Sequence, residues 1–523
     1  MLKKSFLKLK PVIYEFLFYV AVFAFSIVSY VIFKPKYSGN EVVGRGDYAK
    51  YYALSLLLLI VFVGVFLYRL KKLDRTKLIF LLILASFVVR LCYVLYTEGI
   101  ARQYDTNSDT GHYGYARTLF ETGKLPDSNS YQFYHPPFNA FIQSVFMHFF
   151  QEYFNLINSG FIFLTGNKGI EMTTESFFFA CQNLSLLYTV VFSVTACKIF
   201  KELEIGGTGG IIAVIFVLFY PRLIQFSGQL NNDMLCLMLI AVSVLWAIKF
   251  YKDQSWFSIV VLAVVVGLTL MTKLNGATVC LPIAILFVIL FVKKIVAKER
   301  VELTAICAKY LTFIIVCAPL GLWFQVYAKI RFDQSFAYVF PYLNGNLSTA
   351  DKTFAQRFFF PPPSVIFSSK YANAWEHYNL FDYTMKSSVF GEFSYWGGDG
   401  FAFLGIMLNY AYTLSFAACY AMFIFDRKER GVKIFDLPFI LLSSVLFTMI
   451  ISQFAFNLKM PYGCTMDFRY IVPIILAGGG LTGLMFNESG DARIVGFKTT
   501  AFINAFLAVA FVAVTSVFYF NCI

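Results

Sequence analysis

Acidic and histidine side chains gather between residues 105 and 137, in the sequence DTNSDTGHYGYARTLFETGKLPDSNSYQFYHPP. Carboxylates and imidazoles in one short segment are the groups that most often move protons in catalysis. The segment is polar, whereas the sequence on both sides of it is strongly apolar. We therefore predict that it carries the chemistry and that apolar helices hold it against a membrane surface.

Asp109 is the predicted general base of this segment. The sequence from about Gly111 onward has a helical pattern, and a carboxylate at a helix N-terminus is favoured by the helix dipole. The alternative for Asp109 is a helix-capping role alone. Asp105 lies four residues earlier and is the second catalytic candidate, either sharing a metal ion with Asp109 or orienting it. Its alternative is an ordinary solvated loop residue.

Five further side chains are predicted to contact substrate. His112 and Tyr113 follow Asp109 directly, and His135 stands before two prolines that break the segment. A capping role is the alternative for His135. Asn232 and Asp233 belong to a polar group at the predicted outer end of two apolar runs.

Four cations lie within or beside apolar runs, namely Arg90, Arg222, Lys273 and Arg469. Cations at membrane depth are energetically costly and usually have a partner. Snorkelling to the interface or pairing with an acid would explain each one separately. Because all four are predicted near one face, we expect them to bind a phosphate or pyrophosphate at headgroup level, where Arg grips phosphate with two parallel hydrogen bonds.

The composition is that of an integral membrane protein. The 523 residues are 59% hydrophobic and 14% charged, with mean hydropathy +0.68, whereas soluble domains have about 45–50% apolar and about 25% charged residues. The net charge of +13 fits cytoplasmic loops that face anionic lipid. No basic tract is typical of nucleic-acid binding, and no Cys or His spacing indicates zinc.

Thirteen apolar runs approach the roughly 20 residues that a spanning helix needs. They are 12–33, 51–68, 78–97, 177–200, 208–226, 232–250, 256–273, 276–293, 305–329, 401–424, 436–456, 469–486 and 500–520.

The apolar segment 138–150 is left out of this set. It is short for a crossing, and its apolar residues recur at i, i+3, i+4 and i+7, which predicts an amphipathic helix lying in the membrane interface. With this segment outside the count, basic residues concentrate in the predicted cytoplasmic connections, as the positive-inside rule expects. The connection 34–50 is an exception, because it places four cations outside.

These runs predict an all-α polytopic membrane protein with two large outer loops. We divide the chain into two N-terminal spans (1–76), a spanning module (77–330) that contains the first outer loop (98–176), a second outer loop that could act as a lid (331–400), and C-terminal spans (401–523).

With these residues in view, the chain resembles the GT-C superfamily of membrane glycosyltransferases, and in particular protein O-mannosyltransferases and lipid A aminoarabinose transferases, of the glycosyltransferase family 39 type. The resemblance rests on the segment S-D-T-G-H-Y-G-Y-A from 108 to 116 and on H-P-P-F from 135 to 138. The family carries an Asp-Glu pair, whereas Asp109 is followed here by Thr110. Whether Asp105 supplies the second acid stays open.

The resemblance implies a GT-C fold and an inverting glycosyltransferase, of the hexosyl- or mannosyltransferase kind. The donor would be a polyprenyl-phosphate sugar, and the acceptor a hydroxyl on a glycan, lipid or protein. Asp109 would take the acceptor proton, and the cations would stabilise the departing phosphate. It implies no certain cofactor, and a divalent metal is left open. The expected location is the bacterial plasma membrane with the site outward, with the endoplasmic reticulum as the alternative.

Two other functions compete with this one. A transporter or flippase needs acids within its spans, but nearly all acids of this chain lie outside the apolar runs. A non-catalytic lipid-binding membrane protein would bind polyprenyl phosphate without transferring sugar.

Overall fold

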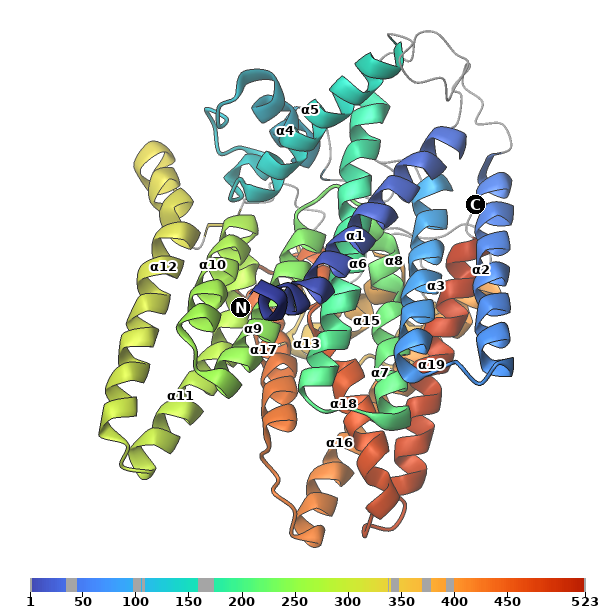
Figure 1. Cartoon of the computed structure of the whole chain (residues 1–523), viewed down its shortest axis with the longest axis vertical. Helices are drawn as coiled ribbons and strands as arrows, with labels where there is room; N and C mark the ends of the chain where they lie inside the picture. Colours follow the sequence, from blue (N-terminus) through green and yellow to red (C-terminus); the bar gives the residue numbers. More distant parts are fainter. Residues whose placement is uncertain are drawn as a thin grey trace.

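The computed structural model is a bundle of long helices, with helices α4 and α5 outside one end (Figure 1). The structure describes residues 2–33, 45–96, 105, 109–158, 174–336, 338–339, 348–368, 378–391 and 399–521. Within these ranges no strand forms, and the sole extended pairing is a bridge between Ser348 and Tyr462. The predicted all-α class is confirmed.

Helices form at all thirteen predicted apolar runs. They are α1 (Leu2–Phe33), α2 (Arg45–Arg69), α3 (Arg75–Tyr96), α6 (Thr174–Glu202), α7 (Gly207–Leu218) with α8 (Pro221–Ser227), α9 (Asp233–Asp253), α10 (Trp256–Thr272), α11 (Cys280–Val296), α12 (Arg300–Phe332), α16 (Asp399–Arg430), α17 (Leu437–Lys459), α18 (Ile474–Glu488) and α19 (Phe497–Asn521).

Ten of the described helices are long and apolar enough to cross a membrane, and α7 with α8 adds an eleventh if the bent pair is one span. Helix α10 has 17 residues and α18 has 15, and both fall short of that length. The count of thirteen crossings therefore stays a prediction.

The break between α7 and α8 is fixed by Pro221 and Arg90. Pro221 occupies the first turn of α8, where its missing N–H is not needed. The buried Arg90 guanidinium donates to the carbonyl of Leu218 at the end of α7 (2.5 Å) and to Ser193 Oγ (2.9 Å). The helix axis bends by 43° between α7 and α8.

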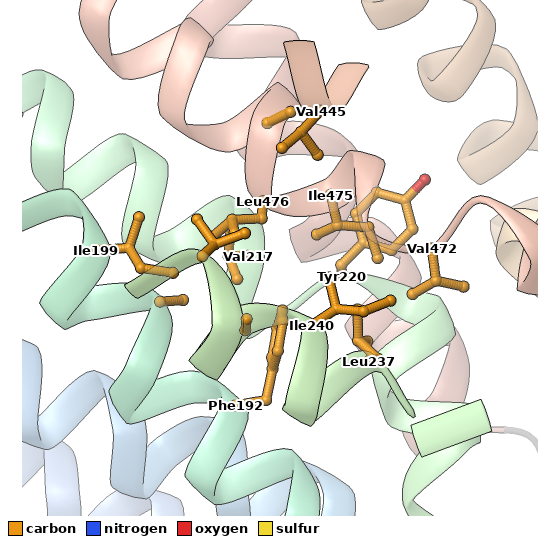
Figure 2. Close-up of a cluster of buried hydrophobic side chains, with 14 of the residues drawn as sticks. Phe192, Ile199, Val217, Tyr220, Leu237, Ile240, Val445, Val472, Ile475 and Leu476 are labelled. Atoms are coloured by element: carbon orange, nitrogen blue, oxygen red, sulfur yellow. The ribbon is translucent and has the colours of Figure 1, made fainter. Parts of the chain in front are cut away.

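The helices pack through a continuous apolar core (Figure 2). Side chains from α6, α7, α9, α17 and α18 meet there, including Phe192, Val217 and Ile240. Helices α7 and α18 approach so closely that a Cβ on Gly209 would lie 2.1 Å from the carbonyl oxygen of Gly483. Small residues permit such contact, which is a main source of attraction between helices in lipid.

Helix α5 (Phe138–Asn158) continues beyond the predicted end at residue 150. Phe141, Val145 and Phe149 form an exposed apolar stripe, whereas Gln143 is buried and donates to the carbonyl of Leu230 (2.6 Å). The side of the helix that carries Gln143 therefore faces protein, together with the apolar Met147 and Phe150, while the stripe of Phe141, Val145 and Phe149 faces outward. Although α5 has 21 residues, it is not among the helices apolar enough to span. Its position in the membrane interface stays a prediction.

Short elements complete the end of the molecule at which α4 and α5 lie, which we name the loop end. They are α4 (His112–Thr122), η1 (Tyr131–Tyr134), η2 (Leu274–Val279), α13 (Phe354–Phe358), α14 (Pro363–Ser368), α15 (Leu380–Phe390), η5 (Gly463–Met466) and η6 (Phe468–Tyr470). Helix α15 packs against α8, α16 and η6. It begins at Asn379, whose side chain accepts from the backbone N–H of Asp382.

Candidate functional site

Asp105 is the centre of a charged cluster at the loop end. Its side chain is buried, and its Oδ2 lies 3.2 Å from Arg469 Nη1 and 3.6 Å from His112 Nε2. Its backbone carbonyl accepts from the N–H of His112 (2.8 Å), which fixes Asp105 to the first turn of α4. The structure thus brings residues 364 positions apart into contact.

His112 and His135 lie with their rings stacked, 5.6 Å between centroids and 13° between planes. Burial lowers the pKa of His112 below its ordinary 6.5, and the neighbouring Asp105 carboxylate opposes that shift. Burial, the nearby His112 and the positive charges of Lys273 and Arg469 lower the pKa of His135 well below 6.5. Both imidazoles are therefore neutral at pH 7.

The ends of α9 and α10 bring Asp233 and Lys273 together as a buried ion pair. Asp233 is the first residue of α9 and Lys273 directly follows α10, so each charge lies where the helix dipole favours it. Asn232 joins the same two ends, because its amide donates to the carbonyl of Thr272 (3.1 Å). The ammonium of Lys273 also lies 5.3 Å from the ring centroid of Tyr470.

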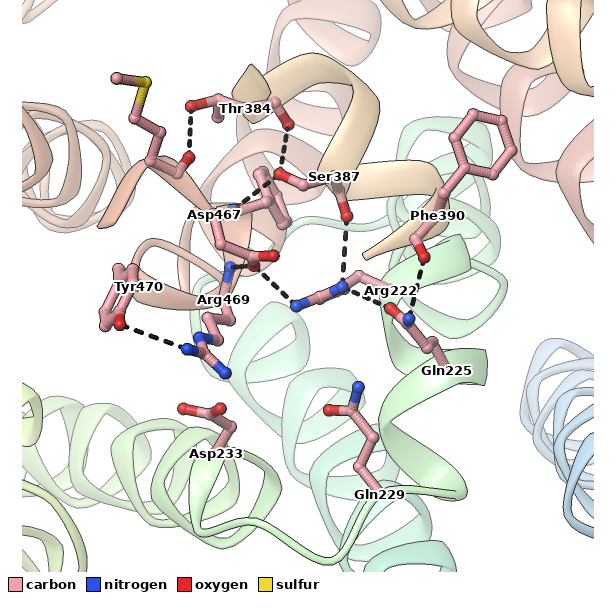
Figure 3. Close-up of polar contacts among 12 residues, drawn as sticks. Arg222, Gln225, Gln229, Asp233, Thr384, Ser387, Phe390, Asp467, Arg469 and Tyr470 are labelled. Atoms are coloured by element: carbon pink, nitrogen blue, oxygen red, sulfur yellow. Dashed lines mark hydrogen bonds and ion pairs between the residues drawn. The ribbon is translucent and has the colours of Figure 1, made fainter. Parts of the chain in front are cut away.

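Arg469 links the two acids of the cluster. Besides its contact with Asp105, its guanidinium lies directly above the carboxylate of Asp233 (Figure 3). The ring of Tyr470 is 5.3 Å from that guanidinium, and Tyr470 in turn accepts a hydrogen bond at its backbone carbonyl from Asn275 (2.9 Å). The cluster therefore holds two acids, two cations and two neutral imidazoles.

Two carboxylate oxygens in this cluster lack a donor. Among the described residues, Asp105 Oδ1 and Asp233 Oδ2 are buried without a hydrogen-bond partner. Leaving a buried polar atom unsatisfied costs about 1–3 kcal/mol, and more for a charged group. Such atoms mark a place where a ligand with hydroxyl groups would complete the hydrogen bonding.

The acids of this cluster lie beside fixed cations. Within the described ranges, no group of three or more His, Cys, Asp and Glu side chains is placed to hold a metal ion. The oxygens of Asp105 and Asp233 already have Arg469 and Lys273 beside them, and these fixed cations would repel a divalent metal.

Three predicted site residues lie outside the cluster. The carboxylate of Asp109, the predicted base, is exposed. Tyr113 is buried in a separate apolar cluster, with its ring 4.4 Å from that of Phe178. Arg90 holds the α7–α8 break, bonded to Leu218, Ser193 and the carbonyl of Thr189 (3.1 Å). The structure does not bring these residues to Asp105.

Arg222 lies near the cluster but has other partners. Its guanidinium pairs with the carboxylate of Asp467 (2.7 Å), and both side chains are completely buried. The same Asp467 oxygen accepts from the backbone N–H of Arg469 (2.6 Å). Sequence reasoning missed Asp467, although an acid two residues before Arg469 in the sequence MDFRY was a signal for it.

The buried histidines predict a pH-dependent stability. Because burial lowers their pKa values, the unfolded chain binds more protons than the folded one below about pH 6.5, so stability falls as pH falls through that range. We expect the thermal unfolding midpoint to drop between pH 7.5 and 5.5. His135→Phe, which keeps a ring in the stack, should flatten this dependence; an equally steep dependence in the variant would contradict the assignment.

The chain is similar to known proteins in two comparisons. Residues 171–323 match the family described as dolichyl-phosphate-mannose-protein mannosyltransferase. Among solved structures the chain is similar to ArnT from Cupriavidus metallidurans bound to undecaprenyl phosphate, with 12% identity, 80% of each chain covered and a TM-score of 0.35. A search of curated proteins gives no match. The family match, which runs through α6 to α12, confirms the likeness of this chain to the GT-C superfamily of membrane glycosyltransferases.

Proposed function

We propose that the chain is an inverting glycosyltransferase that moves a sugar from a polyprenyl-phosphate donor to an acceptor hydroxyl. The observation that carries this proposal is the buried cluster in which Asp105 lies 3.2 Å from Arg469 and keeps one carboxylate oxygen without a donor. The family match supports sugar transfer. The match to a mannosyltransferase family makes a mannose-type donor the first to test.

Asp105 is the general base in this proposal. Its Oδ1 takes the proton of the acceptor hydroxyl while the acceptor oxygen forms a bond to the anomeric carbon. The bond from that carbon to the donor phosphate breaks on the opposite face of the sugar, so the configuration inverts. Neutral His112, 3.6 Å from Asp105 Oδ2, lies beside the carboxylate without neutralising its charge.

Lys273 and Arg469 stabilise the leaving phosphate. The charge on the phosphate grows as the bond to the sugar breaks, and fixed cations in a buried site stabilise that charge more than water would. Asp233 holds Lys273 in place through their ion pair. Its free Oδ2 is available to a sugar hydroxyl of the donor.

An apolar cavity of about 400 Å³ supports a lipid-linked donor. It is lined mostly by aromatic and aliphatic side chains from α7, α15, α16, α17 and α18, such as Tyr412, Phe416 and Phe447. Phe468 and Ile471, which flank Arg469 and Tyr470 in sequence, also lie in its wall. The cavity therefore borders the segment that carries the phosphate-binding cation, and it accommodates part of a polyprenyl chain.

Two neighbouring alanines on α16 test the cavity. Both are exposed, but Ala417 lines the cavity and Ala418 does not. We expect Ala417→Phe to raise the KM for a long-chain donor by about tenfold, because the new ring removes contacts of roughly two buried methylene groups. A short-chain donor should be affected less. Ala418→Phe should leave both KM values unchanged; equal effects of the two variants would argue against a lipid tail here.

The experiment that tests the function uses purified protein and a panel of polyprenyl-phosphate sugars. The proposal expects the sugar to leave at least one donor, with release of polyprenyl phosphate, when an acceptor mixture from the cell envelope is present. Binding of polyprenyl phosphate without loss of sugar from any donor would instead identify a lipid-binding protein or flippase. We further propose that the loop end faces outward across a bacterial plasma membrane.

A further inference from the structure

Arg222 and Asp467 form a buried support directly behind the cluster. We infer that they are positioning residues, which hold the η6 segment so that the side chain of Arg469 points at Asp105. This inference deepens the proposed function and rests on it, because it assigns Arg222 to the support of the site and not to the donor phosphate. It also explains why a glycine, Gly391, stands at the end of α15, where a side chain would collide with Arg222.

Both terminal nitrogens of the Arg222 guanidinium have protein partners, whereas its Nε is buried without one. Its Nη2 donates to Asp467 Oδ1 (2.7 Å), and its Nη1 donates to Gln225 Oε1 and to the carbonyl of Ser387 (3.3 Å). Its side chain is 1% exposed, and it lies 4.9 Å from the ring centroid of Phe226. A phosphate could reach the terminal nitrogens only by displacing these partners. Arg222 is therefore poorly suited to bind the donor.

Asp467 transmits this support to Arg469. Its Oδ1 accepts both from Arg222 and from the backbone N–H of Arg469 (2.6 Å), which fixes the direction in which η6 begins. Figure 3 shows the consequence: the side chain of Arg469 leaves η6 toward Asp233, on the opposite side of the backbone from Ser387. An acid at this position thus sets where the cation of the cluster lies.

Helix α15 holds the same segment from the other side. Ser387 Oγ accepts from the N–H of Phe468 (2.9 Å), and Thr384 Oγ1 donates to the carbonyl of Met466 (3.0 Å). These two contacts bracket Asp467 along the chain. The segment that leads into the 3₁₀ turn η6 is therefore held at three consecutive residues: Met466 and Phe468 by α15, and Asp467 by Arg222.

Gly391 lies where the end of α15 meets the side chains of Arg222 and Gln225. A Cβ at this position would lie 2.0 Å from Gln225 Nε2 and 2.2 Å from Arg222 Nη1. Its φ of +69° is also one that side-chain-bearing residues rarely adopt. Any larger residue must push the Arg222 and Gln225 side chains away, which would loosen Asp467 and, through it, Arg469.

Gly391→Ala is the first test, with Gly123→Ala as its control. Gly123 also has a positive φ (+66°), but a Cβ there would meet no atom within 4 Å. We expect Gly391→Ala to lower kcat/KM for sugar transfer and to weaken binding of polyprenyl phosphate alone, each by about tenfold, because a charge-assisted hydrogen bond to the phosphate is disturbed. Gly123→Ala should change neither. Equal losses in the two variants, or no loss in Gly391→Ala, would overturn the inference.

Non-additivity with Arg469→Ala separates positioning from a merely structural role. If Gly391 and Asp467 act through Arg469, then Gly391→Ala added to Arg469→Ala should cause almost no further loss of phosphate binding. A simple loss of folded protein would instead lower binding by the same factor in both backgrounds, and that result would contradict the inference.

A variant pair guards against a folding defect. The single variant Asp467→Asn leaves the buried Arg222 without its carboxylate partner and could fail to fold for that reason. A second variant therefore replaces both partners, as Arg222→Met with Asp467→Leu. Apolar replacement of a whole buried ion pair is often tolerated. The folded double variant should still lose about tenfold in phosphate binding, and unchanged binding would overturn the inference. If the wild-type protein binds polyprenyl phosphate but transfers no sugar, the proposed function fails, while the positioning inference can still be tested by binding. If the wild-type protein does not bind polyprenyl phosphate, the proposed function and the positioning inference are both contradicted.

Discussion

Asp105→Asn is expected to abolish sugar transfer while the protein remains folded and binds its donor. The asparagine side chain has the same shape and still offers an oxygen to Arg469, but it cannot take the proton of the acceptor hydroxyl. Loss of a general base costs about 10²–10⁴-fold in rate. Turnover is measured with the donor identified from the panel, and donor binding is measured separately with polyprenyl phosphate.

Asp109→Asn is the matched control, because Asp109 lies in the same segment but its carboxylate is exposed. We expect this variant to retain turnover within about twofold, since surface substitutions rarely change free energies by more than about 0.5 kcal/mol. Loss of activity in Asp109→Asn with full activity in Asp105→Asn would restore Asp109 as the base. It would also remove the buried cluster from the chemistry.

Arg469→Ala and Lys273→Ala should each weaken donor binding strongly. A charge-assisted hydrogen bond contributes about 1.5–3 kcal/mol, so each variant is expected to raise the Kd for polyprenyl phosphate by about 10- to 150-fold. Turnover should fall further than binding, because the leaving phosphate gains charge in the transition state. Isothermal titration or a labelled-lipid competition assay measures the Kd.

Two controls belong with these cation variants. Arg331 is an exposed cation that faces Asp127 at 3.9 Å, and Arg331→Ala should leave the Kd unchanged. Lys273→Ala leaves Asp233 buried without its partner, which can cost about 3–5 kcal/mol of stability. The double variant Lys273→Ala with Asp233→Ala removes that penalty and should still bind the donor weakly. Wild-type Kd values in both Arg469→Ala and the double variant would exclude a phosphate at this cluster.

Much of the fold could be predicted because a membrane imposes a strong pattern. Each apolar run of about 20 residues became a helix, and the i, i+3, i+4 pattern after Pro137 became α5. The length of α5 was underestimated because the pattern was judged only up to Phe150, whereas the helix continues to Asn158. The bend at Pro221 was not predicted, although proline after an apolar run is a recognised signal for one.

The site was predicted only in part, because a sequence does not show which side chains face one another. His112, His135, Asp233, Lys273 and Arg469 were chosen by type and location, and the structure brings them together around Asp105. The preference for Asp109 followed the order of residues in a family motif, while the burial that distinguishes Asp105 depends on contacts 364 residues away.

Arg90 and Arg222 show why a buried cation is an ambiguous signal. Each was predicted to bind phosphate, since charge at membrane depth is costly. In the structure, Arg90 donates to the carbonyl of Thr189 in α6 and to that of Leu218 at the end of α7, and Asp467 pairs with Arg222. Apart from Gln225, three residues from Arg222, the protein partners of these two cations lie 99 to 245 residues away in sequence, which no local pattern reveals.

The most direct test is an experimental structure of the protein with a polyprenyl-phosphate sugar bound, using the Asp105→Asn variant to prevent turnover. Our account predicts the phosphate in contact with both Lys273 and Arg469, the anomeric carbon next to residue 105, and the start of the lipid chain near Phe468. A phosphate held at the other end of the molecule, or sugar density beside Asp109 and away from Arg469, would contradict it.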